Sequence, residues 1–219
     1  MKPAPARLQP TTPTHGRLAH TLLLAPALTL ALLGGCSLNK ANPAKAVFAL
    51  EARREGAAQP HSAAVLRVRP FTAASPFDDR NFFYRVGGLQ FEEDFYSEFL
   101  VTPRLLVTDQ TRRWLSQAQR FRAVLEAGSK ADSTHSLEGN ITALYADFRE
   151  PTASKAVLEI RFLLLKDSLA SPEIQHDRIY RQEIPLENRQ PATLAIGWSK
   201  ALAQILAALE TDLATTLKP

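Results

Sequence analysis

The chain has 219 residues, a formal net charge of +4 and a single cysteine, Cys36. One cysteine excludes a disulfide within the chain, so a packed core must stabilise the fold. Of the 26 basic residues, Lys2, Arg7 and Arg17 precede the apolar run Leu22–Leu33, and the other 23 balance 22 acidic residues, the first of which is Glu51. This balance argues against a nucleic-acid partner.

The amino-terminal segment predicts the signal peptide of a bacterial lipoprotein. Basic residues precede the apolar run Leu22–Leu33, which is too short to span a bilayer. Gly34 and Gly35 then lead from Leu33 into Cys36, an order similar to the lipobox that signal peptidase recognises. Cys36 is therefore the predicted lipid attachment site. The alternatives are an ordinary secretory signal that leaves a free thiol, and a short uncut anchor.

Cleavage before Cys36 divides the chain into a signal peptide (1–35), a lipidated tether (36–45) and one domain (46–219). A triacylated cysteine carries more than one acyl chain, which stable membrane anchoring requires. The second mature residue is Ser37 rather than aspartate. By analogy with enterobacterial sorting, this favours the periplasmic face of the outer membrane over the inner membrane.

The first predicted elements are strands over Ala46–Arg53 and Ala63–Phe71, followed by a loop over Thr72–Asn81. Two further β-rich runs, Phe82–Val86 and Leu89–Phe95, flank a pair of glycines. Tight hairpin turns need positive φ angles, so this arrangement predicts a hairpin.

Thr102-Pro103 predicts a helix start, with threonine as the N-cap and proline at the first helical position. The helix is expected to continue to Arg120. One helical face carries the residues expected to be buried, which are Val107, Thr111, Trp114, Leu115 and Ala118.

The second half predicts four strands and a long helix. The strands are expected at Phe121–Leu125, His135–Phe148, Ala156–Leu165 and Asp177–Leu186, and the helix at Pro191–Leu217. Its apolar stripe consists of Leu194, Trp198, Leu202, Ile205, Leu209 and Leu213. This order predicts an α+β fold with a single mixed, largely antiparallel sheet and two main helices packed on one face.

No catalytic, metal or cofactor site is predicted. There is no Gly-x-Ser-x-Gly nucleophile motif. The mature chain has three histidines, His61, His135 and His176, and we expect each to be solvated in a loop or at a strand end. A hydrolase would need one of them beside a serine and a carboxylate.

Seven of the 17 aromatic residues fall within the predicted hairpin and its exit. Rings interleaved with charges suit an interface with a buried apolar centre and a charged rim. The candidate partner-binding residues are Tyr84, Arg85, Phe91, Phe95 and Tyr96. The alternative is that the rings fill the core beneath the first helix.

Five segments carry a family resemblance, through their order and spacing. They are VLRVRPF (65–71), FFYRVGGLQFEEDFYSEFLVTP (82–103), RRWL (112–115), LEGNITALYADF (137–148) and AVLEIRF (156–162). With the lipobox and the closing helix, they resemble the ABC-type transport auxiliary lipoproteins. That family includes the lipoprotein partner of the paraquat-inducible MCE transport system.

The resemblance implies a lipoprotein that works with an MCE-domain protein, a permease and an ATPase to move lipid or another hydrophobic substrate between the two membranes. It carries over no catalytic residue and implies no enzyme activity. Some relatives form rings, which adds a homo-oligomer to the expected partners. A scaffold or binding lipoprotein for envelope polysaccharide export or outer-membrane assembly is the second hypothesis.

Overall fold

The computed structural model describes residues 44–58 and 62–217. The predicted signal peptide, its predicted cleavage motif, Cys36 and most of the predicted tether therefore lie outside the described residues, as does His61. From residue 44 onward, the described chain has its own hydrophobic core and forms one compact unit.

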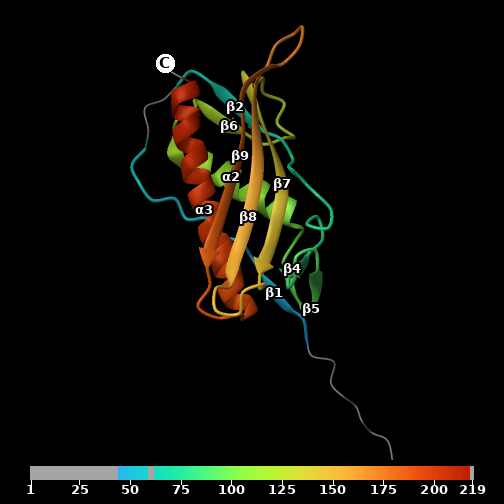
Figure 1. Cartoon of the computed structure of the whole chain (residues 1–219). Helices are drawn as coiled ribbons and strands as arrows, with labels where there is room; N and C mark the ends of the chain where they lie inside the picture. The colour runs from blue at the N-terminus through green and yellow to red at the C-terminus, as the bar shows by residue number, and fades with distance from the viewer. Residues whose placement is uncertain (1–43, 59–61, 218–219) are drawn as a thin grey trace, which may run out of the picture. The chain divides into compact units, whose positions relative to one another are not determined.

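Three long antiparallel strands form one side of the sheet, with β9 at its edge: β7 (His135–Asp147), β8 (Lys155–Lys166) and β9 (Glu173–Pro185) (Figure 1). Along β8 the side chains alternate between the two faces of the sheet. Leu158, Ile160 and Phe162 are fully buried, whereas Glu159 and Arg161 lie on the opposite face. This period-2 pattern is the one that the sequence predicts.

Six further strands, of two to nine residues, complete the nine-stranded sheet of the described residues. They are β1 (Ala46–Phe48), β2 (Val65–Val68), β3 (Thr72–Ala73), β4 (Asn81–Arg85), β5 (Phe91–Phe99) and β6 (Ala123–Leu125). The second edge of β7 pairs in parallel with β2, β3 and β4 in turn. β6 continues the sheet from β2, β5 from β4, and β1 from β5.

The described residues form two helices, α2 (Pro103–Ala118) and α3 (Pro191–Thr216). Both begin with proline, whose missing N–H is not needed in the first turn. The predicted apolar stripes are the buried ones. By length and composition α3 is the helix of the described part that could span a membrane, but its apolar stripe packs against β8 and β9. The predicted α+β class is confirmed.

Trp198 of α3 is at the centre of the core and is fully buried. Its ring lies 4.8 Å from that of Phe82 and 5.3 Å from that of Phe99, and its Nε1 donates to the carbonyl of Val157 at 3.1 Å. At Gly139 the backbone approaches another ring closely, because a Cβ there would lie 2.7 Å from Phe71. Phe82 and Phe99 therefore fill the core, as the alternative expected of some of these rings, but they pack against α3 rather than beneath the first helix.

The first predicted strand was too long, because β1 ends at Phe48. Beyond it the chain leaves β5, with which β1 pairs, and crosses the helices as an irregular segment, residues 49–57, which we call the strap. Leu50 of the strap is buried in the core, and the amide of Ala52 donates to Gln110 of α2 at 3.0 Å.

An ion pair holds the end of the strap against α3. The guanidinium of Arg54 donates to both carboxylate oxygens of Glu210, at 2.8 and 3.0 Å, and Nε1 of Trp114 donates to the same carboxylate at 2.7 Å. The side chains of Arg54 and Glu210 are only 6% and 12% exposed. Burial alone would raise the pKa of Glu210, but the hydrogen bonds from Arg54 and Trp114 lower it. The clamp therefore holds a charged carboxylate.

Three other expectations were wrong in detail. The predicted loop at 72–81 contains β3 and the start of β4, because Thr72 and Ala73 find partners on β7. The hairpin connection is not a tight turn: the amides of Val86 and Gly87 both donate to the carbonyl of Gln90, and in the described residues Gly56 is the glycine with positive φ. Finally, β9 begins at Glu173, four residues early.

Candidate functional site

The β4–β5 hairpin contains a bulge. Phe83 is opposite Glu93 and Asn81 is opposite Glu98, so β5 advances five residues while β4 advances two. The extra residues cannot continue the regular ladder, and a bulge of this kind redirects side chains.

The carboxylate of Asp94 holds the bulge in place. One oxygen accepts the amide N–H groups of Tyr96 at 2.7 Å and Ser97 at 3.1 Å, and the other accepts the hydroxyl of Tyr84. Burial, together with the hydrogen bond to Asp94, raises the pKa of Tyr84 well above its usual value. Tyr84 is thus a neutral donor that positions the bulge, rather than an exposed contact.

The bulge places two consecutive rings on the surface. Phe95 is 65% exposed and Tyr96 49% exposed, and their rings pack edge to face at 5.3 Å. In a regular strand, consecutive side chains point to opposite faces of the sheet. We call Phe95 and Tyr96 the aromatic pair.

The aromatic pair lies beside the point where the chain arrives from its amino-terminal segment. β1 runs parallel to β5, with Ala46 opposite Ser97. Immediately before β1, Nζ of Lys45 lies 5.4 Å from the centre of the Phe95 ring and 3.2 Å from the carboxylate of Glu98. The predicted tether therefore ends at this surface.

Phe91 and Arg85 belong to a second group. Phe91 is 42% exposed and packs edge to face on Tyr145 at 5.4 Å, and the guanidinium of Arg85 lies 5.8 Å from the Phe91 ring. Phe77 stacks on the same tyrosine at 6.1 Å. The five predicted residues thus divide into the aromatic pair, a positioning tyrosine and this Phe91–Arg85 group on the sheet face.

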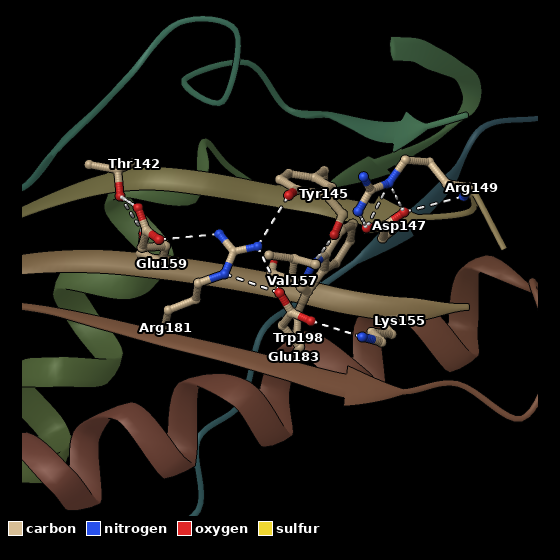
Figure 2. A network of polar contacts seen from close by, with 10 residues as sticks. All are labelled: Thr142, Tyr145, Asp147, Arg149, Lys155, Val157, Glu159, Arg181, Glu183 and Trp198. Carbon is tan, nitrogen blue, oxygen red and sulfur yellow. Dashed lines mark hydrogen bonds and ion pairs between the residues drawn. The ribbon is translucent and has the colours of Figure 1, made fainter. Parts of the chain in front are cut away.

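The sheet face opposite the helices carries a network of charges centred on Arg181 (Figure 2). Its guanidinium donates to Glu159 at 3.2 Å, to the Tyr145 hydroxyl at 3.3 Å and to Glu183 at 2.8 Å. Lys155 donates to Glu183 at 3.0 Å. Hydrogen bonds from Arg181 and Lys155 lower the pKa of Glu183, so the network stays charged at neutral pH.

A shallow cavity of about 520 Å³ lies on this open face, beside Arg69, Glu138 and Arg161. Arg69 lies 3.7 Å from Glu138, and Arg161 donates to both carboxylate oxygens of Asp177, at 2.7 and 2.5 Å. Both cations are therefore already neutralised within the chain, and the cavity offers no concentrated charge to an anion.

Of the two described histidines, His135 lies at a strand end as expected but is buried rather than solvated, and His176 is half-buried. His135 is 8% exposed; its ring nitrogens contact the hydroxyl of Thr134 at 2.8 Å and the amide oxygen of Gln175 at 3.1 Å. Burial lowers its pKa. His176 lies inside β9, 2.9 Å from the hydroxyl of Tyr180.

These contacts do not form a nucleophile–base–acid arrangement. The hydroxyl of Thr134 also donates to the backbone carbonyl of Val65 at 3.2 Å, and Gln175 stands where a triad would place a carboxylate. The nearby carboxylate of Asp167 accepts the hydroxyls of Ser133 and Ser136 instead. Among residues 44–58 and 62–217, no group of three potential His, Cys, Asp or Glu ligands could hold a metal ion.

No protein-family model and no curated protein matches the chain. Solved structures do match. Protein XCC0632 from Xanthomonas campestris, described as a DUF330 protein, superposes with a TM-score of 0.70 at 18% identity, over 78% of this chain and 95% of that one. An uncharacterized protein superposes with a TM-score of 0.60 at 13% identity, over 78% of this chain and 99% of that one. At such identities the likeness shows a shared fold alone.

Proposed function

We propose that the chain is a non-enzymatic lipoprotein of the bacterial envelope, held at the periplasmic face of the outer membrane by acyl chains on Cys36. It serves as the docking component of an MCE-type ABC transporter that moves lipid or another hydrophobic substrate between the membranes. The observation that carries the proposal is the exposed aromatic pair, Phe95 and Tyr96, at the junction of the tether and the domain.

The tether supports this placement. The nine residues from Ser37 to Lys45 span at most about 30 Å when fully extended. Lipidation at Cys36 would therefore keep the β1–β5 edge close to the bilayer, where an envelope-spanning partner must meet it.

The chemistry of the surface supports a protein partner. Large exposed rings with two χ angles lose little conformational entropy on binding and commonly anchor interfaces. The adjacent side chains of Glu92 and Glu93 are exposed acids on the same strand. A partner with an apolar pocket and a basic rim would match both features.

The direct experiment is photo-crosslinking in cells. A photoreactive amino acid is placed at Phe95 or Tyr96, and captured proteins are identified by mass spectrometry. Leu169, which is fully exposed in the β8–β9 connection, is the matched control position. Capture of the MCE-domain protein, permease or ATPase from Phe95 and Tyr96 but not from Leu169 is expected.

Two results would contradict the proposal. Capture of polysaccharide-export or outer-membrane assembly proteins would favour the scaffold hypothesis, and equal capture from Leu169 would show that the aromatic pair is not a specific surface. Tyr84→Phe sharpens the test, because it removes the hydroxyl that Asp94 accepts while retaining the ring. When Tyr84→Phe is combined with the photoreactive amino acid at position 95, the yield of crosslinked partner is expected to fall, because the bulge that exposes this position is less well held.

A further inference from the structure

β9 presents a long open edge. The strand has 13 residues, and in the described part of the chain it pairs with β8 alone. Natural edge strands are usually blunted by short length, charged side chains, proline or β-bulges. β9 is long, has no lysine, and has no proline before its last residue, Pro185. It has five charged residues and a register shift between Ile174 and His176, but from His176 onward its pairing with β8 is regular.

The faces of β9 are set by its contacts. Asp177 and Arg181 lie on the open face, where they bond Arg161 and Glu159 of β8. Ile179 lies between them in sequence and is 55% exposed.

The other β9 face points toward α3. On that face Tyr180 donates to Asp212 of α3 at 2.6 Å, and Arg178 donates to the same carboxylate at 2.7 Å. A strand added at the β9 edge would extend both faces of the sheet. If the two copies were related by a two-fold axis perpendicular to the sheet, their open faces would lie on one side and their helix-covered faces on the other.

We propose that β9 pairs with β9 of a second copy of this chain, antiparallel, about a two-fold axis that passes through Ile179. In this register Asp177 of each copy is opposite Arg181 of the other, so two opposite-charge pairs form. The two Ile179 side chains meet on the axis between them. Opposite charges and aliphatic side chains facing each other across a ladder are favourable cross-strand pairs.

The neighbouring registers are worse. An axis through Asp177 places the two aspartates together, and an axis through Arg181 does the same with the two arginines. An axis through Arg178 opposes the two Arg178 side chains, and an axis through Tyr180 opposes Asp177 and Glu183. Like charges directly opposite each other destabilise a sheet. Among the five registers with the axis at residues 177 to 181, the charge order of β9 therefore favours the one through Ile179.

The pairing also suits a membrane-anchored protein. One strand pair buries less area than a stable soluble dimer requires. Anchoring both copies to the same membrane raises their effective concentration, which compensates for a small interface. The test therefore belongs in cells.

The first test is cysteine crosslinking of Ile179→Cys with a short bis-maleimide in intact cells. Across the proposed axis the two introduced thiols face each other. Ile174→Cys is the matched control, because Ile174 is also exposed on β9. In this register its copy would lie about 34 Å away along the strands. The parent chain controls for Cys36.

A dimer band with Ile179→Cys and none with Ile174→Cys is expected. Absence of the band with Ile179→Cys, or equal bands from both positions, overturns the proposal. This surface is distinct from the aromatic pair, so its failure leaves the proposed transporter docking unaffected.

Charge reversal tests the register itself. Asp177→Arg or Arg181→Asp, each combined with Ile179→Cys, should lose the dimer band, because each alone makes like-charge pairs. Coexpression of the two variants with different tags should restore a heterodimer, since one copy then supplies two arginines and the other two aspartates. Asp132→Arg, an exposed change away from β9, should retain the band. The proposal is overturned if the dimer band persists in either single charge-reversal variant, or if coexpression of the two variants does not restore it.

Discussion

The two faces of the β7–β9 sheet differ in what holds them. On the face covered by α2 and α3, side chains such as Ile160, Phe162 and Trp198 are fully buried. On the open face, Glu159, Arg181 and their neighbours form ion pairs that remain partly exposed. Burial of apolar area stabilises strongly, whereas exposed ion pairs contribute little.

The comparison separates stability from recognition. The covered face should contribute most of the free energy of unfolding. The open face, the free edge of β9 and the bulge of β5 can therefore change with little cost to the fold. These surfaces also carry the proposed contacts. Three experiments test this separation, from the largest expected effect to the smallest.

The largest effect is expected for Trp198→Ala. Removal of a fully buried indole leaves a cavity beside Phe82 and Phe99, and such truncations cost about 3–5 kcal/mol. Urea unfolding followed by circular dichroism measures the loss. Trp198→Phe, which retains a ring, is the control and should lose less. A loss below about 1 kcal/mol for the alanine variant would show that the covered face is not the main source of stability.

A pH effect of intermediate size is expected from His135, whose parity on β7 matches that of buried Leu137. Its folded pKa lies below the ordinary value of 6.5 because the ring is buried. The unfolded state therefore takes up the proton first, and the stabilisation is present above pH 6.5 and is lost as the pH falls from 6.5 toward the folded pKa.

Urea midpoints measured across this window check the expectation. His135→Gln, which cannot titrate, should show a flatter dependence of stability on pH than the parent chain. Equal slopes for the two proteins would show that the pKa of His135 is the same in the folded and unfolded states, which would contradict the prediction.

The smallest effect is expected for Glu159→Gln on the open face. The change removes the charge that faces Arg181, which keeps its bonds to Glu183. Partly exposed pairs of this kind contribute less than about 1 kcal/mol. The same urea measurement checks it, with Trp198→Ala as the reference. A loss of unfolding free energy comparable to that of Trp198→Ala would show that the open face contributes as much to stability as the covered face.

Periodicity explains which elements were predictable. β7, β8 and both helices have strong apolar patterns, and their burial follows those patterns. The early start of β9 was missed because Glu173–His176 has no apolar alternation, and this segment is a strand because β8 provides a partner. β3 was missed for the same reason, since Thr72 and Ala73 pair only with distant residues of β7.

The candidate surface was predictable only in part. Composition placed the aromatic residues in the hairpin, but which of them face solvent depends on the bulge. The bulge depends on Asp94 meeting Tyr84 across the hairpin. Such a contact between residues ten positions apart follows from the strand register, which the local pattern does not specify. The burial of His135 likewise depends on Gln175 from another strand.

The Arg54–Glu210 clamp has a mechanical consequence. Tension applied through the amino terminus first loads the three residue pairs that join β1 to β5. Behind them it meets the buried side chain of Leu50 and then the bidentate ion pair to α3. We expect a pull from the bilayer to detach β1 from β5 first and to be resisted by the clamp. The amino-terminal segment would then extend while the sheet and helices beyond the clamp stay folded.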